Sequence, residues 1–119
     1  MIISGKVKLS VADIDESIHF YIFVLGLLLK ERRGNISAVI ENGDLRLFLE
    51  QQFYRGFNVL PNKNLTSLGV VVSHLDSILT KLEGSKIPVK MHETGDGRMF
   101  VFLDPDGNKI FVREIGKKV

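Results

Sequence analysis

The sequence predicts an α+β protein built from two copies of a βαβββ module. Apolar and polar residues alternate in several short segments, and apolar residues recur at helical spacing in two others. The same order of segments occurs twice along the 119 residues. When the two strand-to-helix junctions are superposed, Val11 falls on Val72 and Ile14 falls on Leu75, a constant offset of 61 residues.

The first module begins with a strand over Lys6–Val11, where polar and apolar residues alternate strictly. A helix is predicted over Asp13–Leu25, because Asp13 suits an N-cap and Gly26 suits a left-handed stop. Three further strands, separated by turns that contain Gly and Asn, are predicted at Leu27–Arg32, Ile36–Glu41 and Leu45–Gln51.

The second module repeats this order. Its predicted elements are a strand over Ser67–Val72, a helix from Leu75 that ends at Gly84, and strands at Ile87–Glu93, Arg98–Leu103 and Lys109–Ile115. Residues 52–65 show no periodicity and form a connector that is expected to pack against or cover another part of the chain. We therefore expect modules of about 5–51 and 66–115 within a single domain of residues 1–119.

The composition excludes several classes of protein. Cysteine is absent, which removes disulfides, thiolate zinc sites and cysteine nucleophiles. The sequence contains neither a run of eighteen apolar residues nor the pattern of a signal peptide. The net charge is +2 and the basic residues are scattered. We expect a cytoplasmic protein without nucleic-acid or membrane partners.

Two motifs near opposite ends of the chain resemble one known superfamily. Residues 11–21 followed by Val24-Leu25-Gly26 resemble the opening of glyoxalase and bleomycin-resistance proteins, where an Asp-capped helix carries Phe-Tyr and ends in Leu-Gly. The segment Asp104-Pro105-Asp106-Gly107-Asn108 resembles a hairpin of the same superfamily. The resemblance covers nearly the whole chain and implies the vicinal oxygen chelate superfamily, which includes extradiol dioxygenases. Its two βαβββ modules form a cupped mixed sheet.

The same resemblance implies a metal site that these residues do not supply. In the superfamily, four strand positions point His, Glu or Gln ligands into the cup, and the matching positions here hold Lys6, Phe48, Ser67 and Phe111. Protonated lysine has no lone pair to offer, and phenylalanine has no donor atom. We therefore predict neither a metal nor another cofactor.

The assignment of these positions depends on strand register. Alternation places Leu47 under the helix and Phe48 in the cup, whereas counting from the turns at Gly43 and Gly107 matches Leu47 with Phe111. We follow the alternation, since burial outweighs turn length. Neither register yields a metal site. The three histidines are expected on or beside the helices, or on a strand that supplies no ligand: His19, His74 and His92.

A cup floored by aromatic rings and edged by cations suits a flat, aromatic or partly anionic organic molecule. The predicted ligand-binding residues are Lys6, Arg46, Phe48, Glu50, Ser67, Phe111 and Arg113. Glu50 is also the candidate catalytic base, although a carboxylate in this row more often pairs with a cation such as Arg46 or Arg113. The alternative for the cup is an ordinary core, filled by phenylalanines that include Phe100 and Phe102.

The favoured function is metal-free binding of a small molecule, with sequestration of an antibiotic or toxin as its purpose. Two alternatives remain: a glyoxalase- or dioxygenase-like enzyme, a lyase or an oxidoreductase, with a displaced or absent metal site, and a metal-free enzyme that uses Lys6 or Glu50 as base. A homodimer is expected, because eight short strands leave sheet edges that a partner can cover. The connector 52–64 is long enough to let modules exchange between chains.

Overall fold

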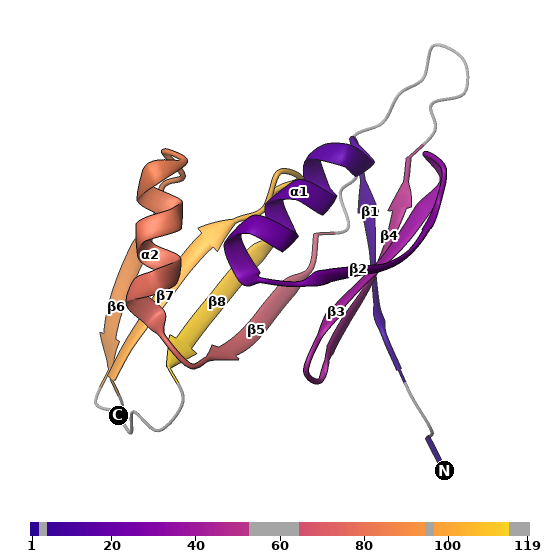
Figure 1. Cartoon of the computed structure of the whole chain (residues 1–119). Coiled ribbons are helices and arrows are strands. Elements are labelled where there is room, and N and C mark those ends of the chain that lie inside the picture. The colour runs from indigo at the N-terminus through magenta and orange to yellow at the C-terminus, as the bar shows by residue number, and fades with distance from the viewer. Residues whose placement is uncertain (3–4, 53–64, 95–96, 115–119) are drawn as a thin grey trace. The chain divides into compact units, whose positions relative to one another are not determined.

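The computed structural model describes residues 1–2, 5–52, 65–94 and 97–114. The chain divides into two compact units, residues 1–64 and 65–119. Each unit is a four-stranded mixed sheet with one helix, and its elements run β-α-β-β-β (Figure 1). The predicted α+β class and the duplicated βαβββ order are therefore confirmed. Neither helix in the described ranges is long and apolar enough to cross a membrane.

Unit 1 consists of β1 (Val7–Val11), α1 (Ile14–Leu25), β2 (Leu28–Arg33), β3 (Ser37–Asn42) and β4 (Leu45–Gln51). Unit 2 consists of β5 (Ser67–Val72), α2 (Leu75–Gly84), β6 (Lys90–Thr94), β7 (Gly97–Leu103) and β8 (Lys109–Glu114). The strand orders are β1-β4-β3-β2 and β5-β8-β7-β6. In each sheet the first two strands are parallel and the other pairs are antiparallel.

Several predicted boundaries were wrong by one to three residues. Strand β1 begins at Val7, one residue after the predicted Lys6. Strands β2 and β3 each begin and end one residue later than predicted, and β7 begins one residue earlier. Strand β6 begins at Lys90 instead of Ile87, because the Ile87 N–H donates to the Leu82 carbonyl at the end of α2 and Pro88 has no N–H. The predicted last residue of β8, Ile115, lies outside the described residues.

The ends of α1 follow the sequence signals. Asp13 is the N-cap, and its side chain accepts a hydrogen bond of 3.1 Å from the Glu16 N–H. Gly26 adopts the left-handed conformation (φ 71°), and its N–H donates to the Ile22 carbonyl. The Asn42 side chain then donates to the Gly26 carbonyl at 2.9 Å, which ties the β3–β4 hairpin to the end of the helix.

Each unit has its own core between its helix and one face of its sheet. In unit 1, α1 contacts β2, β3 and β4 and buries Leu47, Leu49 and Ile40. In unit 2, α2 contacts β8, and Phe100 and Phe102 are buried at 0% and 2% exposure. These two rings belong to the helix-side core and do not face a cup. The opposite face of each sheet, which carries no helix of its own unit, is called the open face below.

The strand register resolves the conflict between alternation and turn length. Val7 pairs with Leu47 in unit 1, and Leu68, which lies 61 residues after Val7, pairs with Ile110 in unit 2. Leu47 and Ile110 are therefore equivalent, and so are Phe48 and Phe111. The turns differ in length, because Asn42 pairs with Leu45 whereas Leu103 pairs with Lys109. The alternation is confirmed and the turn count is wrong.

The turn between β7 and β8 is held by a buried polar network. The Asp104 carboxylate accepts hydrogen bonds from the backbone N–H groups of Asp106 and Asn108 and from the Asn108 side chain, at 3.0, 2.8 and 2.8 Å. The Asn108 side-chain oxygen accepts from the Thr66 N–H at 2.7 Å. The Asp-Pro-Asp-Gly-Asn motif therefore fixes the turn and also attaches it to the start of β5.

Candidate functional site

The open face of unit 1 is polar and carries several charged side chains. In the β1–β4 pair, Lys8 lies opposite Phe48 and Ser10 lies opposite Glu50. Lys8 Nζ lies 3.0 Å from Glu50 Oε1. The predicted pairing of Glu50 with a cation is confirmed, but within unit 1 the partner is Lys8 and not Arg46, which pairs with Glu41. Alternation gives the face on which a residue lies and does not give the neighbouring strand.

Arg46 is engaged by a different carboxylate. Its Nε lies 2.6 Å from Glu41 Oε2, because Glu41 and Arg46 are directly opposite in the β3–β4 hairpin. Arg46 was predicted to take the charge of a ligand, and this ion pair lowers its availability for that role. Both Arg46 and Glu50 thus already have a charged partner within unit 1.

A cavity of about 290 Å³ lies on this open face, around Phe48. It is lined by residues from β2, β3, β4 and the segment before β1: Lys6, Glu31, Arg33, Ser37, Ala38, Val39 and Phe48. Phe48 is half-buried, and Lys6 Nζ lies 4.4 Å from the centre of its ring. A cation at this distance from an aromatic face is attracted by the ring quadrupole. Two of the predicted ligand-binding residues, Lys6 and Phe48, are therefore brought together here.

Glu31 and Arg33 line the cavity because β2 is irregular. Leu29 pairs with Ile40, whose side chain is buried on the helix side, whereas Glu31 pairs with Val39, the open-face neighbour of Phe48. The register shift between Leu29 and Glu31 places Glu31 and Arg33 on the open face.

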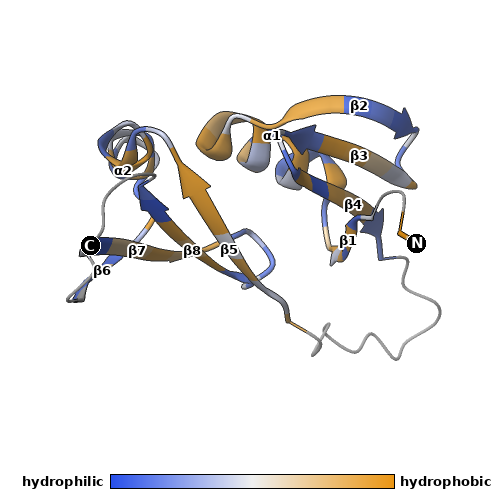
Figure 2. Ribbon diagram, turned by 90° about the horizontal axis from the view of Figure 1, so that it is seen from below, coloured by the Kyte–Doolittle hydropathy of each residue, from blue (hydrophilic) through white to orange (hydrophobic). Residues whose placement is uncertain are grey.

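Sequence reasoning missed both residues, because uninterrupted alternation from Leu29 would place them under the helix. One signal was present. Four consecutive charged residues, 30–33, follow two leucines in this strand, so regular alternation would put charges in the core. Figure 2 shows this change along β2 from hydrophobic to hydrophilic residues.

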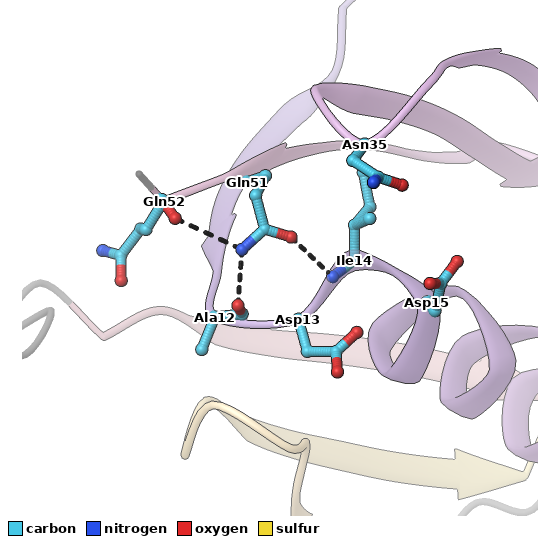
Figure 3. Close-up of a pocket in the computed structure, with 7 residues that line it drawn as sticks. All are labelled: Ala12, Asp13, Ile14, Asp15, Asn35, Gln51 and Gln52. Carbon is cyan, nitrogen blue, oxygen red and sulfur yellow. Dashed lines mark hydrogen bonds between the residues drawn. The ribbon is translucent and has the colours of Figure 1, made fainter. Parts of the chain in front are cut away.

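A second hollow, of about 410 Å³, lies at the start of α1 and has a structural role (Figure 3). The Gln51 side chain accepts from the Ile14 N–H at 2.8 Å and donates to the carbonyls of Ala12 and Gln52. Asp15, also in its lining, is paired with Arg32 at 2.5 Å. Because these polar groups bind one another, we place the functional site in the cavity at Phe48.

The open face of unit 2 is more apolar. Phe111 is half-buried between Gly69 on β5 and Val101 on β7. Among the described residues, and apart from the neighbours of Gly69 in the chain, no atom lies within 4 Å of the place where a Gly69 Cβ would stand. Val71 and Leu103 are each 50% exposed. The remaining predicted binding residues of this unit, Ser67 and Arg113, are exposed at its parallel strand pair. The predicted roles of Ser67, Phe111 and Arg113 stay predictions.

The histidines lie in three different surroundings. His19 is exposed on α1 and stacks on Phe23 with ring centroids 6.0 Å apart. His74 is the N-cap of α2 and makes no side-chain capping bond. His92 is half-buried on β6, opposite Met99.

Comparison with known proteins gives the family of the chain. The family model described as the Glyoxalase/Bleomycin resistance protein/Dioxygenase superfamily matches residues 4–112. The chain belongs to this superfamily. The match confirms the resemblance that the two sequence motifs indicated.

Individual members of the superfamily are similar over most of their length. The chain is 30% identical over 108 residues to glutathione transferase FosA of Serratia marcescens. The match covers 89% of this chain and 76% of that protein. The fold of this chain is similar to lactoylglutathione lyase from Agrobacterium tumefaciens, with 22% identity, a TM-score of 0.70 and coverage of 96% and 95%. It is also similar to the oxidase ChaP-H2, with 17% identity, a TM-score of 0.75 and 98% of each chain covered.

The donor set does not fit the metal of the superfamily. At two of the four implied ligand positions the Lys6 ammonium rests on the Phe48 ring, so a cation and an apolar face occupy the place of two donors. The other two positions hold Ser67 and Phe111. Within the described ranges, no three His, Asp or Glu side chains are grouped so that they could hold an ion. We therefore derive no chemical step through a metal.

Proposed function

We propose that this chain is a metal-independent small-molecule-binding protein of the glyoxalase and bleomycin-resistance type, which holds a flat organic anion in the unit 1 cavity. One observation carries the proposal: Lys6 lies over the ring of Phe48 in a cavity that Arg33 also lines, and neither cation has an acidic partner within 4.0 Å in the described residues. Elsewhere on this face, Lys8 and Arg46 are both paired with carboxylates. An anionic ligand would supply the missing partner.

The expected affinity is modest. Burial of one flat ring against Phe48 contributes on the order of 2 to 3 kcal/mol, and a charge-assisted hydrogen bond contributes about as much again. Together these terms correspond to dissociation constants from about millimolar to tens of micromolar. Tighter binding requires contacts beyond those of the cavity itself.

Arg33 allows a matched test. Calorimetric titration of the full chain with 4-methylbenzoate should show saturable binding, and Arg33→Gln should weaken it at least about fivefold because a charge-assisted bond is lost. Arg32→Gln is the control, since Arg32 is paired with Asp15 near the start of α1 and does not line the cavity. Equal effects of the two substitutions, or the absence of binding, would contradict the proposal.

A metal-free enzyme is the second candidate, because the superfamily relative from Serratia marcescens is named a glutathione transferase. Glu50 would be the base, and it is paired with Lys8 at 3.0 Å. Turnover of a glutathione-linked substrate, abolished by Glu50→Gln and Lys6→Met with the fold retained, would favour this candidate. Glutathione conjugates that bind without turnover favour the binding protein.

We propose sequestration of an antibiotic or toxin as the physiological purpose of binding. A protein that binds without chemistry protects a cell by lowering the free concentration of its ligand. Expression of the chain should raise the inhibitory concentration of an aromatic, acidic antibiotic, and Arg33→Gln should remove the protection. Equal inhibitory concentrations with and without the chain, across a panel of such drugs, would reject this purpose.

We also propose that the protein is a homodimer. All six residues of the edge strand β2 are exposed, and Leu28 and Leu29 are 57% and 43% exposed. The unpaired backbone groups of an exposed edge strand are a template for pairing with another chain. Light scattering at micromolar concentration should give twice the chain mass of 13.4 kDa. A measured mass equal to one chain would contradict the homodimer and show that no second copy covers the edge strand β2.

A further inference from the structure

The cavity at Phe48 contains a carboxylate as well as two cations. Glu31 lines it together with Lys6 and Arg33, and Glu31 forms no ion pair within 4.0 Å in the described parts of the chain. The other two carboxylates of this open face, Glu41 and Glu50, are both paired with cations at 3.0 Å or less. A purely anionic ligand leaves the presence of Glu31 in the cavity unexplained and would be repelled by it.

The register places Glu31 and Arg33, the two charged residues of β2 that line the cavity, at different levels of the sheet. Glu31 lies opposite Val39, which lies opposite Phe48, whereas Arg33 lies opposite Ser37. Residues two apart on a strand are separated by about 6.6 Å along it. Glu31 and Arg33 therefore present a negative and a positive group to the same cavity. Their separation along the strand is close to the length of a benzene ring with one substituent.

The size and floor of the cavity limit what can join these two charges. A volume of about 290 Å³ is at the lower end of small-molecule pockets and suits a molecule with one ring. Val39 and Phe48, both half-buried, provide an apolar surface on which such a ring can lie. Lys6 lies over the Phe48 ring, and Glu31 and Arg33 line the cavity from β2.

We propose that the cavity selects a one-ring aromatic zwitterion, with its anionic group at Arg33 and Lys6 and its ammonium group at Glu31. This inference rests on the proposed function and adds the second charge of the ligand. Because the three charged groups of the protein and both charged groups of the ligand lose water on binding, each must find its opposite charge for the binding to be favourable. A ligand with only the anionic group leaves Glu31 partly desolvated and without a partner.

Three probes of nearly equal shape test this selectivity in the full chain. 4-(Aminomethyl)benzoate is the zwitterion, 4-methylbenzoate carries only the anion, and 4-methylbenzylamine carries only the cation. Calorimetric or NMR titration should give an affinity for the zwitterion at least about tenfold higher than for either single-charge probe. Glu31→Gln should remove this advantage and leave the affinity for 4-methylbenzoate equal or higher.

Glu16→Gln is the control for the change in net charge. Glu16 is exposed in the first turn of α1 and does not line the cavity, so its substitution should leave the tenfold preference intact. Failure of both carboxylate probes to bind would overturn the proposed function itself. Binding of 4-methylbenzoate without a preference for the zwitterion, or a preference that survives Glu31→Gln, would overturn the inference alone.

Discussion

Replacement of Asp104 by alanine is expected to lower the free energy of unfolding by about 3 kcal/mol. Asp104 is 5% exposed, and its carboxylate accepts hydrogen bonds from two backbone N–H groups and from the Asn108 side chain. Alanine leaves these buried donors without their acceptor, and the link from Asn108 to Thr66 on the β5 side loses its support. Urea denaturation followed by circular dichroism measures the loss.

Asp44 provides the matched control, because it is an exposed aspartate in the β3–β4 hairpin turn of the other unit. Asp44→Ala should change the free energy of unfolding by no more than about 0.5 kcal/mol. The loss of unfolding free energy for Asp104→Asn should lie between those for Asp104→Ala and Asp44→Ala. Asparagine retains one acceptor oxygen, but its NH₂ group faces the NH₂ group of Asn108. Equal losses for Asp104→Ala and Asp44→Ala would show that the network does not hold the turn.

Phe48→Glu is expected to weaken binding of 4-methylbenzoate about a hundredfold, or roughly 3 kcal/mol. The substitution removes the ring on which the ligand lies and places a carboxylate beside Lys6, where it competes with the anion for that cation. The fold should persist, because Phe48 faces away from the helix and its neighbours Leu47 and Leu49 fill the core. Calorimetry measures the affinity, and circular dichroism checks the fold.

The control for this substitution is Phe23→Glu, the same chemical change on the outer surface of α1. Phe23 is 44% exposed and does not line the cavity, so its substitution should leave the affinity unchanged within about twofold. If Phe48→Glu retains the affinity of the unaltered chain, the ligand does not lie on the Phe48 ring.

The fold was predictable because some of its signals are local and the order of its elements is repeated. The Asp13 cap and the Gly26 stop depend on nearby residues, the offset of 61 residues relates the two modules, and all three are found in the structure. The boundary of β6 was missed because the end of α2 uses the Ile87 N–H, which is a tertiary detail. Alternation also gave the right face for Phe48 and Phe111, since burial of the opposite row decides it.

The site was predictable only in part, because it depends on contacts across strands. Lys6 and Phe48 were identified from the positions that the superfamily resemblance implies, and they lie in contact. The irregularity of β2 that brings Glu31 and Arg33 to the same cavity leaves one signal in the sequence, the four consecutive charged residues 30–33, and this signal does not say where the register shifts. Arg46 was given a ligand-binding role because its partner Glu41 is adjacent only through the hairpin register. Residues 53–64 of the predicted connector lie outside the described residues.

The central claim is that binding at Phe48 is independent of a metal ion, and one calorimetric experiment tests it directly. The chain is titrated with 4-methylbenzoate in EDTA and again with excess zinc or manganese, and elemental analysis follows each titration. The dissociation constant should be the same in both conditions, with less than one tightly held ion per chain, because Lys6 and Phe48 stand where donors would be needed. Binding that appears only with the metal, accompanied by one ion per chain, would contradict it.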